Sequence, residues 1–459
     1  MRPVDKMVHE LAGRKVLVVG LARSGRAVAR LLARRGCRVT GTDRRDDLDG
    51  LAELAAEGVR FELGGDRLDQ VDQAEIVVLS PGVPLASPLA SAAVERGAVV
   101  IGELELASRL AGLPLLAITG TNGKSTTTAL CAHLLEACGR RAFLGGNIGR
   151  PLSEVLLEEE RPDWAVVEVS SFQLEHLSGP DGLVPEVAIW LNLSPDHLDR
   201  HGGLEPYAAI KRRLFEGQSR EQTGVFFADD PQVAAATEGL ACRKRGFGRR
   251  ESALGPGDVR IDGRRLEVLG EGLVLRLETA SLRGDHNAEN AAAAVAAVLA
   301  CGPCDAAAVQ SGLDSFQGLA HRIQVIRELD GVQYIDDSKG TNPEATAKSL
   351  TSFDSPVVLI AGGRGKGTGY RAMRQAVSER VRELILLGED AGRLAGDLDG
   401  CTGIHRVQTM EEAVGKARQL ARPGDVVLLS PACASFDMFV DYAHRGEVFA
   451  ELVRRLEGE

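Results

Sequence analysis

The stretch ITGTNGKSTTT, residues 118–128, has the composition of a loop that binds phosphate. It follows the apolar run at residues 115–118, which predicts a buried strand, and it precedes a helical pattern with Leu130, Leu134 and Cys138 on one face. A strand, a Gly-rich loop and a helix in this order direct main-chain N–H groups and a helix N-terminus at an anion. The sequence therefore predicts a P-loop domain built on a parallel sheet.

Each position of this loop has an expected role at a nucleotide triphosphate. Lys124 supplies a positive charge, and Ser125 supplies a hydroxyl for Mg²⁺. Ile118 stands where the common G-x-x-x-x-G-K-[ST] pattern has its first glycine, so the loop is a shortened form. A solvated lysine in a Gly/Asn turn is the alternative, which the flanking strand and helix disfavour. The main-chain donors are expected from Gly120, Thr121, Asn122 and Gly123.

Two side chains follow later strands at the edge of the sheet where ligands bind. The run WAVVE ends in Glu168, a candidate Mg²⁺ ligand in the manner of a second acid at a triphosphate site. An exposed acid at the end of a strand is the alternative. His197, in DHLD, is a candidate metal or phosphate contact, although loop histidines more often have a purely structural partner.

Lys211 lies on the apolar face of a predicted helix, beside Tyr207, Leu214 and Phe215. Such a lysine either extends its ammonium group to solvent or has a pKa lowered by desolvation. A neutral amine can form a carbamate with CO₂, which adds an anionic metal ligand. The residues alone favour the solvent-directed side chain.

Apolar runs predict strands at residues 14–20, 38–42, 75–79 and 99–101, then at 115–118, 164–169 and 187–191, and finally at 333–335, 357–361, 383–387 and 426–429. Residues 255–285 alternate around Gly-rich turns, which is typical of a β-meander. The pattern of strand and helix restarts twice along the chain, at residues 112–114 and at residues 317–319. We therefore expect three α/β domains: a Rossmann-like domain at 1–112, a central P-loop domain at 113–318 and a second Rossmann-like domain at 319–459. The first loop, GLARSG, has Ala22 where a dinucleotide fingerprint has its middle glycine. This makes NAD less favoured than a nucleotide diphosphate held by this loop and by Ser80-Pro81-Gly82.

The composition limits the partners. A net charge of −11 and 4% aromatic residues argue against binding nucleic acid, and the charge argues against an anionic membrane surface. The first residues lack a signal-peptide pattern, and no apolar run is long enough to span a bilayer, so we expect a cytoplasmic protein.

The eight cysteines are expected to be free thiols. Cys301-Gly-Pro-Cys304 has the spacing of a redox motif, but it follows an Ala-rich helical run, which favours a helix–helix turn.

A series of motifs resembles the Mur ligase family in content and order over essentially the whole chain. They are TGTNGKST, GGNIG, EVSSFQLE, NLSPDHLDRH, GDHNAEN, HRI, DDSKGTN and SPACASFD. The resemblance implies an ATP-dependent ligase of peptidoglycan precursor synthesis. Its substrate carboxylate takes the γ-phosphate of ATP, and an amine then displaces phosphate from the acyl phosphate. SSFQLE, DSKGTN and SPACASFD resemble the members that add D-glutamate to a UDP-linked sugar bearing L-alanine.

The resemblance also implies roles for individual residues. Ser125, Glu168, His197 and a carbamylated Lys211 would bind two Mg²⁺ ions, and Lys124 would act on the phosphates. ATP would be held by residues 120–126 and by Asn290, Arg322 and Asp337. The UDP-sugar would contact Ser24, Asp43, Arg45, Ser80, Gly82 and Asn147. D-Glutamate would contact Thr341, Lys366, Ser435 and Phe436.

Departures from the family pattern are few. Gly340 replaces an alanine in DSKATN, and Arg23 is unexpected in the first loop, which affects the expected UDP contacts. Cys433 in SPACASFD is interpreted as a packed loop residue, because the acyl-phosphate route needs no thiol nucleophile.

We expect a monomer acting on small molecules. The competing hypotheses are another ligase of the same layout, such as a folate polyglutamate ligase, a nucleotide-sensing regulator, and a small-molecule kinase.

Overall fold

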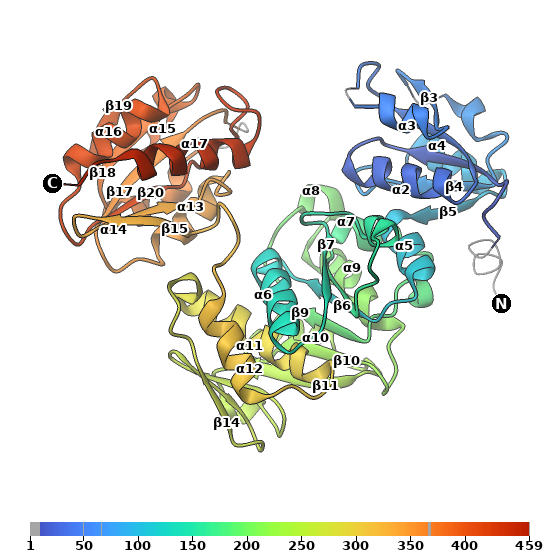
Figure 1. The fold of residues 1–459 in the computed structure, drawn as a ribbon, viewed down its shortest axis with the longest axis horizontal. Coiled ribbons are helices and arrows are strands. Elements are labelled where there is room, and N and C mark those ends of the chain that lie inside the picture. The colour runs from blue at the N-terminus through green and yellow to red at the C-terminus, as the bar shows by residue number, and fades with distance from the viewer. Residues whose placement is uncertain (1–9, 49, 66, 366–368, 459) are drawn as a thin grey trace. The chain divides into compact units, whose positions relative to one another are not determined.

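The computed structural model describes residues 10–48, 50–65, 67–365 and 369–458. Three β-sheets form along the chain (Figure 1). The first two sheets belong to one compact unit, Met1–Leu277 with His286–Asp314, and the third belongs to a second unit, Glu278–Asp285 with Ser315–Glu459. The expectation of a three-part α/β protein is therefore confirmed at the level of sheets.

The first sheet is parallel throughout, in the order β3-β2-β1-β4-β5. Its central apolar strands β1 and β4 are buried on both faces, as a doubly wound arrangement requires. The strands are β1 (Lys15–Val19), β2 (Arg38–Asp43), β3 (Arg60–Leu63), β4 (Ile76–Leu79) and β5 (Val99–Gly102), with helices α2 (Arg23–Arg34), α3 (Ala52–Ala56), α4 (Pro88–Glu95) and α5 (Glu103–Ala111). The sequence patterns anticipated four of these strands and not β3, where RFEL alternates charged and apolar residues over only four positions and none of them is buried.

The central sheet has nine strands in the order β14-β13-β12-β11-β10-β9-β6-β8-β7. Its strands are β6 (Leu115–Thr119), β7 (Ala142–Gly146), β8 (Trp164–Glu168), β9 (Val187–Trp190), β10 (Thr223–Phe227), β11 (Arg243–Gly248), β12 (Val259–Asp262), β13 (Arg265–Val268) and β14 (Leu273–Arg276). The last three strands pair antiparallel, which confirms the predicted meander. β6 lies between β8 and β9, so their carboxyl ends meet beside the loop that follows β6.

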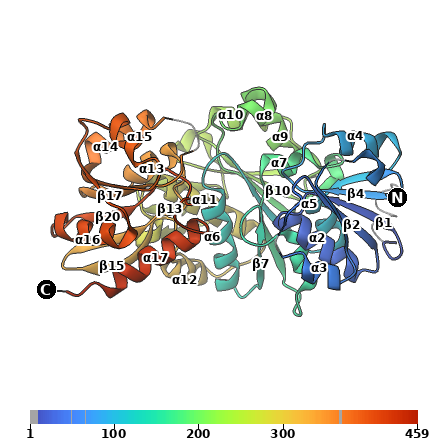
Figure 2. The same cartoon turned by 90° about the horizontal axis from the view of Figure 1, so that it is seen from above.

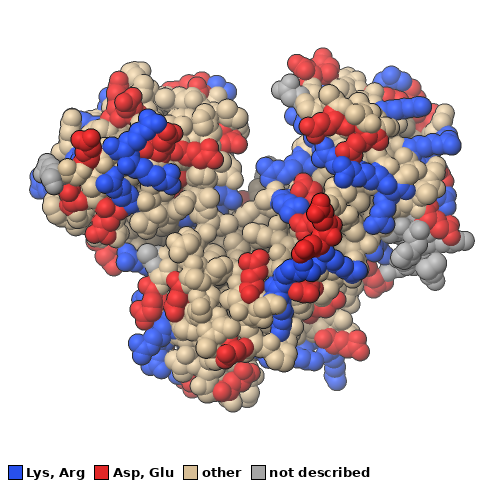
Figure 3. Space-filling model, viewed as in Figure 1, with Lys and Arg blue, Asp and Glu red and all other residues tan. Residues whose placement is uncertain are grey.

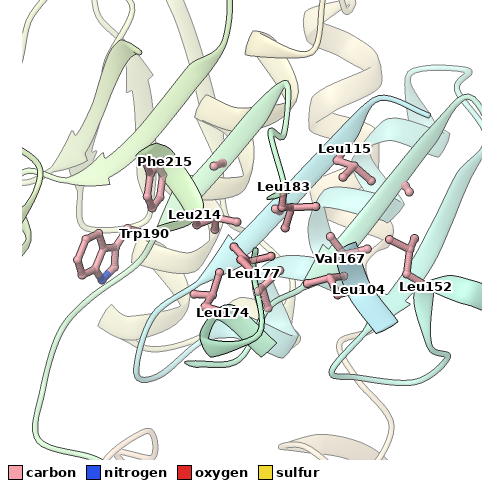
Figure 4. Close-up of a cluster of buried hydrophobic side chains, with 14 of the residues drawn as sticks. Leu104, Leu115, Leu152, Val167, Leu174, Leu177, Leu183, Trp190, Leu214 and Phe215 are labelled. Atoms are coloured by element: carbon pink, nitrogen blue, oxygen red, sulfur yellow. The ribbon is translucent and has the colours of Figure 1, made fainter. Parts of the chain in front are cut away.

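The helices around the central sheet are α6 (Lys124–Ala137), α7 (Ser171–Glu175), α8 (Leu198–His201), α9 (Leu204–Glu216), α10 (Pro231–Ala236), α11 (Asp285–Ala300) and α12 (Ala306–Ser315). One face of the sheet carries a large apolar core (Figure 4). In this core Trp190 of β9 stacks on Phe215 of α9, with ring centroids 5.9 Å apart. This packing fixes α9, the helix that carries Lys211, against the strand beside β6.

The third sheet has the order β15-β16-β20-β17-β18-β19 and is parallel except for β15 with β16. Helices cover both faces, α13 to α15 on one and α16 and α17 on the other (Figure 2). The strands are β15 (Gln324–Leu329), β16 (Val332–Asp336), β17 (Val357–Gly362), β18 (Val381–Leu387), β19 (Gly403–Arg406) and β20 (Val426–Leu429). The helices are α13 (Pro343–Leu350), α14 (Arg374–Arg380), α15 (Ala391–Asp397), α16 (Met410–Leu420) and α17 (Tyr442–Arg455).

Short 3₁₀ segments join several of these elements. They are η1 (Leu68–Val71), η2 (Leu152–Leu157), η3 (Pro180–Gly182), η4 (Glu251–Ala253), η5 (Ala280–Leu282) and η6 (Arg371–Met373). Acidic and basic side chains are interspersed on the face seen in Figure 3. Among the described helices, none combines the length and apolarity needed to cross a bilayer.

Candidate active site

The loop between β6 and α6 has the geometry of a phosphate cradle. Gly120 and Gly123 have φ angles of 150° and 84°, which residues with a Cβ atom rarely adopt. A Cβ atom on Gly123 would also overlap the side-chain amide of Asn290. Asn290, which is expected to contact ATP, therefore lies beside this loop. Ser125 and Thr126, both buried, start helix α6 directly behind the loop.

Asn192, which the sequence analysis assigned no role, holds the loop in shape. Its Oδ1 atom accepts hydrogen bonds from the main-chain N–H groups of Thr121 (3.2 Å) and Asn122 (2.8 Å). Its Nδ2 atom donates to the main-chain oxygen of Asn122 at 3.1 Å. The sequence signals were its position shortly after a buried strand and its place as the first residue of the motif NLSPDHLDRH. That strand, β9, becomes the neighbour of β6 only in the folded sheet.

Two lysines converge on the first glycine of the loop. Lys124 donates to the main-chain oxygens of Gly120 (3.0 Å) and Thr121 (2.8 Å). Lys211 donates to the same Gly120 oxygen at 2.8 Å, and its side chain is buried. The interpretation of Lys211 as a solvent-directed lysine is therefore wrong. The face of α9 that carries Lys211 packs against the loop after β6 and does not face solvent.

The environment of Lys211 favours a neutral amine. Burial lowers the pKa of Lys211 well below its ordinary value of 10.5, and the Lys124 cation lowers it further, against the carboxylates of Asp196 and Glu168. The Nζ atom lies 4.4 Å from the centroid of the Tyr207 ring. A lowered pKa increases the fraction of neutral amine, which is the form that reacts with CO₂.

Glu168 ends β8, next to the strand that leads into the loop. Its side chain is 3% exposed, so the alternative of an exposed acid is wrong. The Oε1 atom accepts a hydrogen bond from Asn147 at 2.7 Å, whereas Oε2 is buried and, within the described chain, has no hydrogen-bond partner. A buried carboxylate oxygen without a partner is costly, and it fits a hard cation such as Mg²⁺.

His197 immediately precedes α8, with a φ of 52°. Its side chain is 46% exposed, its Nε2 atom lies 3.5 Å from Asp196, and its ring lies 4.9 Å from that of Phe172. The described residues contain no group of three or more His, Cys, Asp or Glu side chains arranged for a metal ion. Near the loop, Glu168 offers a buried carboxylate oxygen, and phosphate oxygens commonly supply further ligands to Mg²⁺.

A cleft of about 420 Å³ opens at the carboxyl ends of β1, β2 and β4. It brings together most of the residues expected at the UDP-sugar: Ser24, Asp43, Ser80, Gly82 and Asn147. Asn147 therefore lines this cleft while also donating to Glu168. The shared residue links the cleft to the end of β8 within the first unit.

Arg45 does not line the cleft, in contrast to Arg23 and Arg44. Its guanidinium lies on the carboxylate of Asp43, at 3.0 Å from both oxygens. This hydrogen bond, with the main-chain N–H of Leu21, lowers the pKa of Asp43 to about 2. Arg23 donates to the main-chain oxygen of Gly149 instead. Arg23 of the first loop thus contacts the GGNIG segment, residues 145–149.

In the second unit, Asp337 follows β16 and is buried. Its Oδ2 atom accepts hydrogen bonds from Ser349 (2.6 Å) and Ser430 (2.7 Å). Burial nevertheless raises its pKa to about 6, against these hydrogen bonds and the cation of Arg322. Of the residues expected at D-glutamate, Ser435 is buried, Thr341 is half-buried and Phe436 is exposed, and Lys366 lies outside the described residues.

The cysteines correct one expectation. Cys138 and Cys304 form a disulfide, with Cα atoms 5.6 Å apart, so the prediction of free thiols is wrong for this pair. The prediction of a helix–helix turn is confirmed, because Cys301 to Cys304 lie between α11 and α12. Cys301 stays a thiol whose pKa burial raises. Cys433 is packed as expected, and burial raises its pKa to about 11.

Family comparisons agree with this layout. The MurD-like N-terminal domain of Mur ligases matches residues 14–102, the Mur ligase middle domain matches 118–298, and the glutamate ligase domain of Mur ligases matches 321–433. The chain belongs to the Mur ligase family. It is accordingly an enzyme of the ligase class.

Individual relatives extend the match to nearly the full length. Proteins named UDP-N-acetylmuramoylalanine–D-glutamate ligase from Geotalea daltonii and Geotalea uraniireducens are 45% and 46% identical to this chain, covering 98% of it and 99% of each relative. The protein of the same name from Geobacter metallireducens is 46% identical, over 97% of this chain and 98% of that relative.

Solved structures share the fold at low identity. UDP-N-acetylmuramate–alanine ligase from Thermotoga maritima superposes with a TM-score of 0.60 at 21% identity, covering 96% of this chain and 99% of that one. The MurF ligase of Thermotoga maritima in complex with ADP gives a TM-score of 0.56 at 18% identity, over 99% and 100% of the two chains.

Proposed function

We propose that this protein is an ATP-dependent ligase that adds D-glutamate to UDP-N-acetylmuramoyl-L-alanine in the cytoplasm, as a monomer. The observation that carries the proposal is the convergence of Lys124, Lys211 and Glu168 on one Gly-rich loop, in a chain 45% identical to ligases of that name. The reaction needs ATP because a carboxylate is a poor electrophile at neutral pH.

The chemistry has two steps. The substrate carboxylate attacks the γ-phosphorus of ATP, which gives an acyl phosphate and ADP. The amine of D-glutamate then attacks the acyl carbon, the C–O bond to phosphate breaks, and the amine loses a proton. The N–H groups of the loop and the Lys124 cation stabilise the charge on the transferring phosphoryl group, so the protein contributes mainly alignment and electrostatics.

The residues present fit Mg²⁺. Ser125 at the start of α6 and the unpartnered Oε2 atom of Glu168 would hold the ion, which when bound neutralises phosphate charge. A second ion would be held by His197 and by a carbamate on Lys211. The buried, low-pKa amine of Lys211 supports the carbamate, because only the neutral form of an amine reacts with CO₂.

We assign the substrates to the sheets as follows. Residues 1–112 would bind the UDP-sugar, supported by the cleft that contains Ser24, Asp43 and Ser80. Residues 113–318 would bind ATP, with Asn290 beside Gly123. Residues 319–459 would supply Arg322 and Asp337 to the nucleotide, and Thr341, Lys366, Ser435 and Phe436 to D-glutamate.

The test measures phosphate release from ATP and Mg²⁺ in the presence of UDP-N-acetylmuramoyl-L-alanine, with D-glutamate, L-glutamate, D-alanine or no amino acid, and mass spectrometry of the product. Release that depends on D-glutamate, with a product heavier by one glutamate residue, is the expected result. Release that another amine supports equally would contradict the assignment of the amino-acid substrate. ADP formation with a stable phosphorylated product and no need for an amine would favour a small-molecule kinase.

A further inference from the structure

His201 is a buried histidine that the proposed chemistry does not use. Its side chain is only 2% exposed, and both ring nitrogens face side chains of α7. Nε2 lies 3.0 Å from the Ser171 hydroxyl, and Nδ1 lies 3.2 Å from Oε1 of Glu175. The Nε2 atom and the Ser171 hydroxyl are within hydrogen-bond distance, whereas the approach of Nδ1 to Glu175 is an electrostatic contact. Burial lowers the pKa of His201, in keeping with a neutral ring.

The order serine, histidine, carboxylate is that of a hydrolase triad, but the serine is not available for catalysis. Ser171 is 3% exposed, which prevents an acyl group from reaching its hydroxyl. The two partners of His201 are instead the first and last residues of α7. His201 of α8 therefore contacts both ends of α7 and holds the two helices together.

Arg200, the neighbour of His201 in α8, makes a second connection to the same helix. Its Nη2 atom lies 2.7 Å from Oε2 of Glu175, and its guanidinium lies 5.5 Å from the centroid of the Phe172 ring. Arg200 also donates from Nε to Oε1 of Glu175 at 3.3 Å, so it binds both oxygens of this carboxylate, whose side chain is 15% exposed. The Oε1 atom faces His201 as well. Two consecutive residues of α8 are held by a single carboxylate.

Helix α8 contains only residues 198–201, and the residue before it is His197. Fixing the end of so short a helix also fixes its beginning. The His197 ring packs on Phe172 of α7, the same ring that Arg200 covers. The His197 side chain is 46% exposed and lies 3.5 Å from Asp196, so the packing on Phe172 contributes to the orientation of its ring.

We propose that Glu175 is a positioning residue that acts through Arg200 and His201 to hold α8 on α7 and thereby sets the His197 ring for the reaction. It touches neither ATP nor substrate. The inference rests on the proposed ligase activity for its kinetic test, and a spectroscopic test that needs no turnover accompanies it.

The kinetic test uses Glu175→Gln in the full chain, after D-glutamate-dependent turnover by the unchanged protein has been established. Loss of an outer partner of a metal-site residue costs roughly 10-fold or more in activity. We expect kcat to fall by roughly 10-fold with little change in KM for D-glutamate. The matched control is Glu160→Gln, an exposed carboxylate paired with Arg141, which should leave kcat unchanged.

A double-mutant cycle separates positioning from a general structural effect. If Glu175 acts through His197, the change Glu175→Gln should have little further effect in a His197→Gln background. Independent effects that multiply would overturn the proposal. His201→Gln serves as the second variant and should behave like Glu175→Gln in the same cycle.

The spectroscopic test follows the imidazole ¹H–¹⁵N signals of His197 and His201. In Glu175→Gln, with thermal unfolding unchanged, the His197 signals should move or broaden together with those of His201. Unchanged His197 signals in a folded variant would overturn the proposal whether or not the protein is a ligase. Absence of ligase turnover in the unchanged protein, with the expected His197 shifts, would instead count against the proposed function alone.

Discussion

The Nζ atom of Lys211 donates a hydrogen bond to the main-chain oxygen of Gly120 at 2.8 Å, which joins α9 to the loop that follows β6. The same oxygen accepts a hydrogen bond from Lys124 at 3.0 Å. Two cationic side chains cannot share one carbonyl oxygen without repulsion, so this contact favours the neutral form of the more deeply buried lysine. The tertiary contact thus favours a neutral Lys211 amine, whereas the sequence alone favoured a solvent-directed lysine.

Replacing Lys211 by alanine should remove a carbamate as well as turnover. We expect kcat to fall by about 100-fold or more, in the range seen when a group that stabilises a transition state is lost. In ¹³C-bicarbonate buffer, the unchanged protein should give a carbamate signal that Lys211→Ala lacks. Lys244→Ala, which removes a lysine whose Nζ donates to the Thr237 main-chain oxygen, is the control. A carbamate signal that persists in Lys211→Ala would contradict the assignment.

The carbamate should also depend on pH in a defined direction. Because the folded protein lowers the pKa of Lys211, the amine is neutral at a pH where an ordinary lysine is charged. Acidification protonates the amine and should release CO₂, so the carbamate signal is expected to fall as pH falls. A signal that rises on acidification would contradict a low-pKa lysine as its source.

The change Glu168→Gln should separate stability from activity. Glutamine keeps the acceptor for Asn147 but removes the charge that the unpartnered Oε2 atom carries in a buried site. Without Mg²⁺ the variant should unfold at the same or a higher temperature, because burying an uncompensated charge is costly. Its Mg²⁺-dependent turnover should fall by about 100-fold or more. Stabilisation by Mg²⁺ and ATP that is undiminished in the variant would show that Glu168 does not hold the ion.

Asn192→Ala should weaken ATP binding without a large loss of stability. It leaves the N–H groups of Thr121 and Asn122 without the side-chain acceptor that orders the loop. We expect the KM for ATP to rise by roughly 10-fold, which corresponds to about 1.4 kcal/mol. The control is Asn342→Ala, which removes the cap of α13 and should affect unfolding but not the KM for ATP. Equal ATP affinity in Asn192→Ala would remove this residue from the site.

Asp337 should make stability depend on pH between about 4 and 6. Its folded pKa of about 6 lies above the ordinary value of 3.8, so in this window the folded state binds more protons than the unfolded state. The contribution of this group to stability is present at low pH and is lost as pH rises through 6. Asp337→Asn keeps an acceptor for Ser349 and Ser430 and should gain stability over the unchanged protein as pH rises, by roughly 3 kcal/mol at most. Urea unfolding at several pH values measures the difference, and a constant difference would contradict the raised pKa.

The disulfide between Cys138 and Cys304 should contribute to stability. It closes a long loop, with a sequence separation of 166, and disulfides of this kind contribute about 2–5 kcal/mol. Cys304→Ser and added reductant should each lower the unfolding temperature, whereas Cys301→Ser should not abolish the effect of reductant. Thiol titration of the denatured, unreduced protein should find the six free cysteines. Eight reactive thiols would contradict the bond.

Local sequence patterns accounted for much of the fold. Apolar runs before glycines predicted β1, β4 and β6, and the alternation around Gly-rich turns predicted the antiparallel β12 to β14. The patterns missed β3, β7, β10, β11, β15 and β19. Strands such as RKRGFG in β11 carry charges at half-exposed positions, and they form because a neighbouring strand offers a ladder of hydrogen bonds.

The sequence by itself determined the phosphate loop, because the glycines, the lysine and the start of the helix act within one short segment. It also determined the family, because its motifs recur in a fixed order. Only the tertiary structure decided what lies beside that loop. Asn192, Glu168 and Lys211 reach it from three other elements, and strand order and helix packing set their distances. The pairing of Cys138 with Cys304 and of Glu175 with His201 likewise depends on long-range packing, which residue spacing alone does not encode.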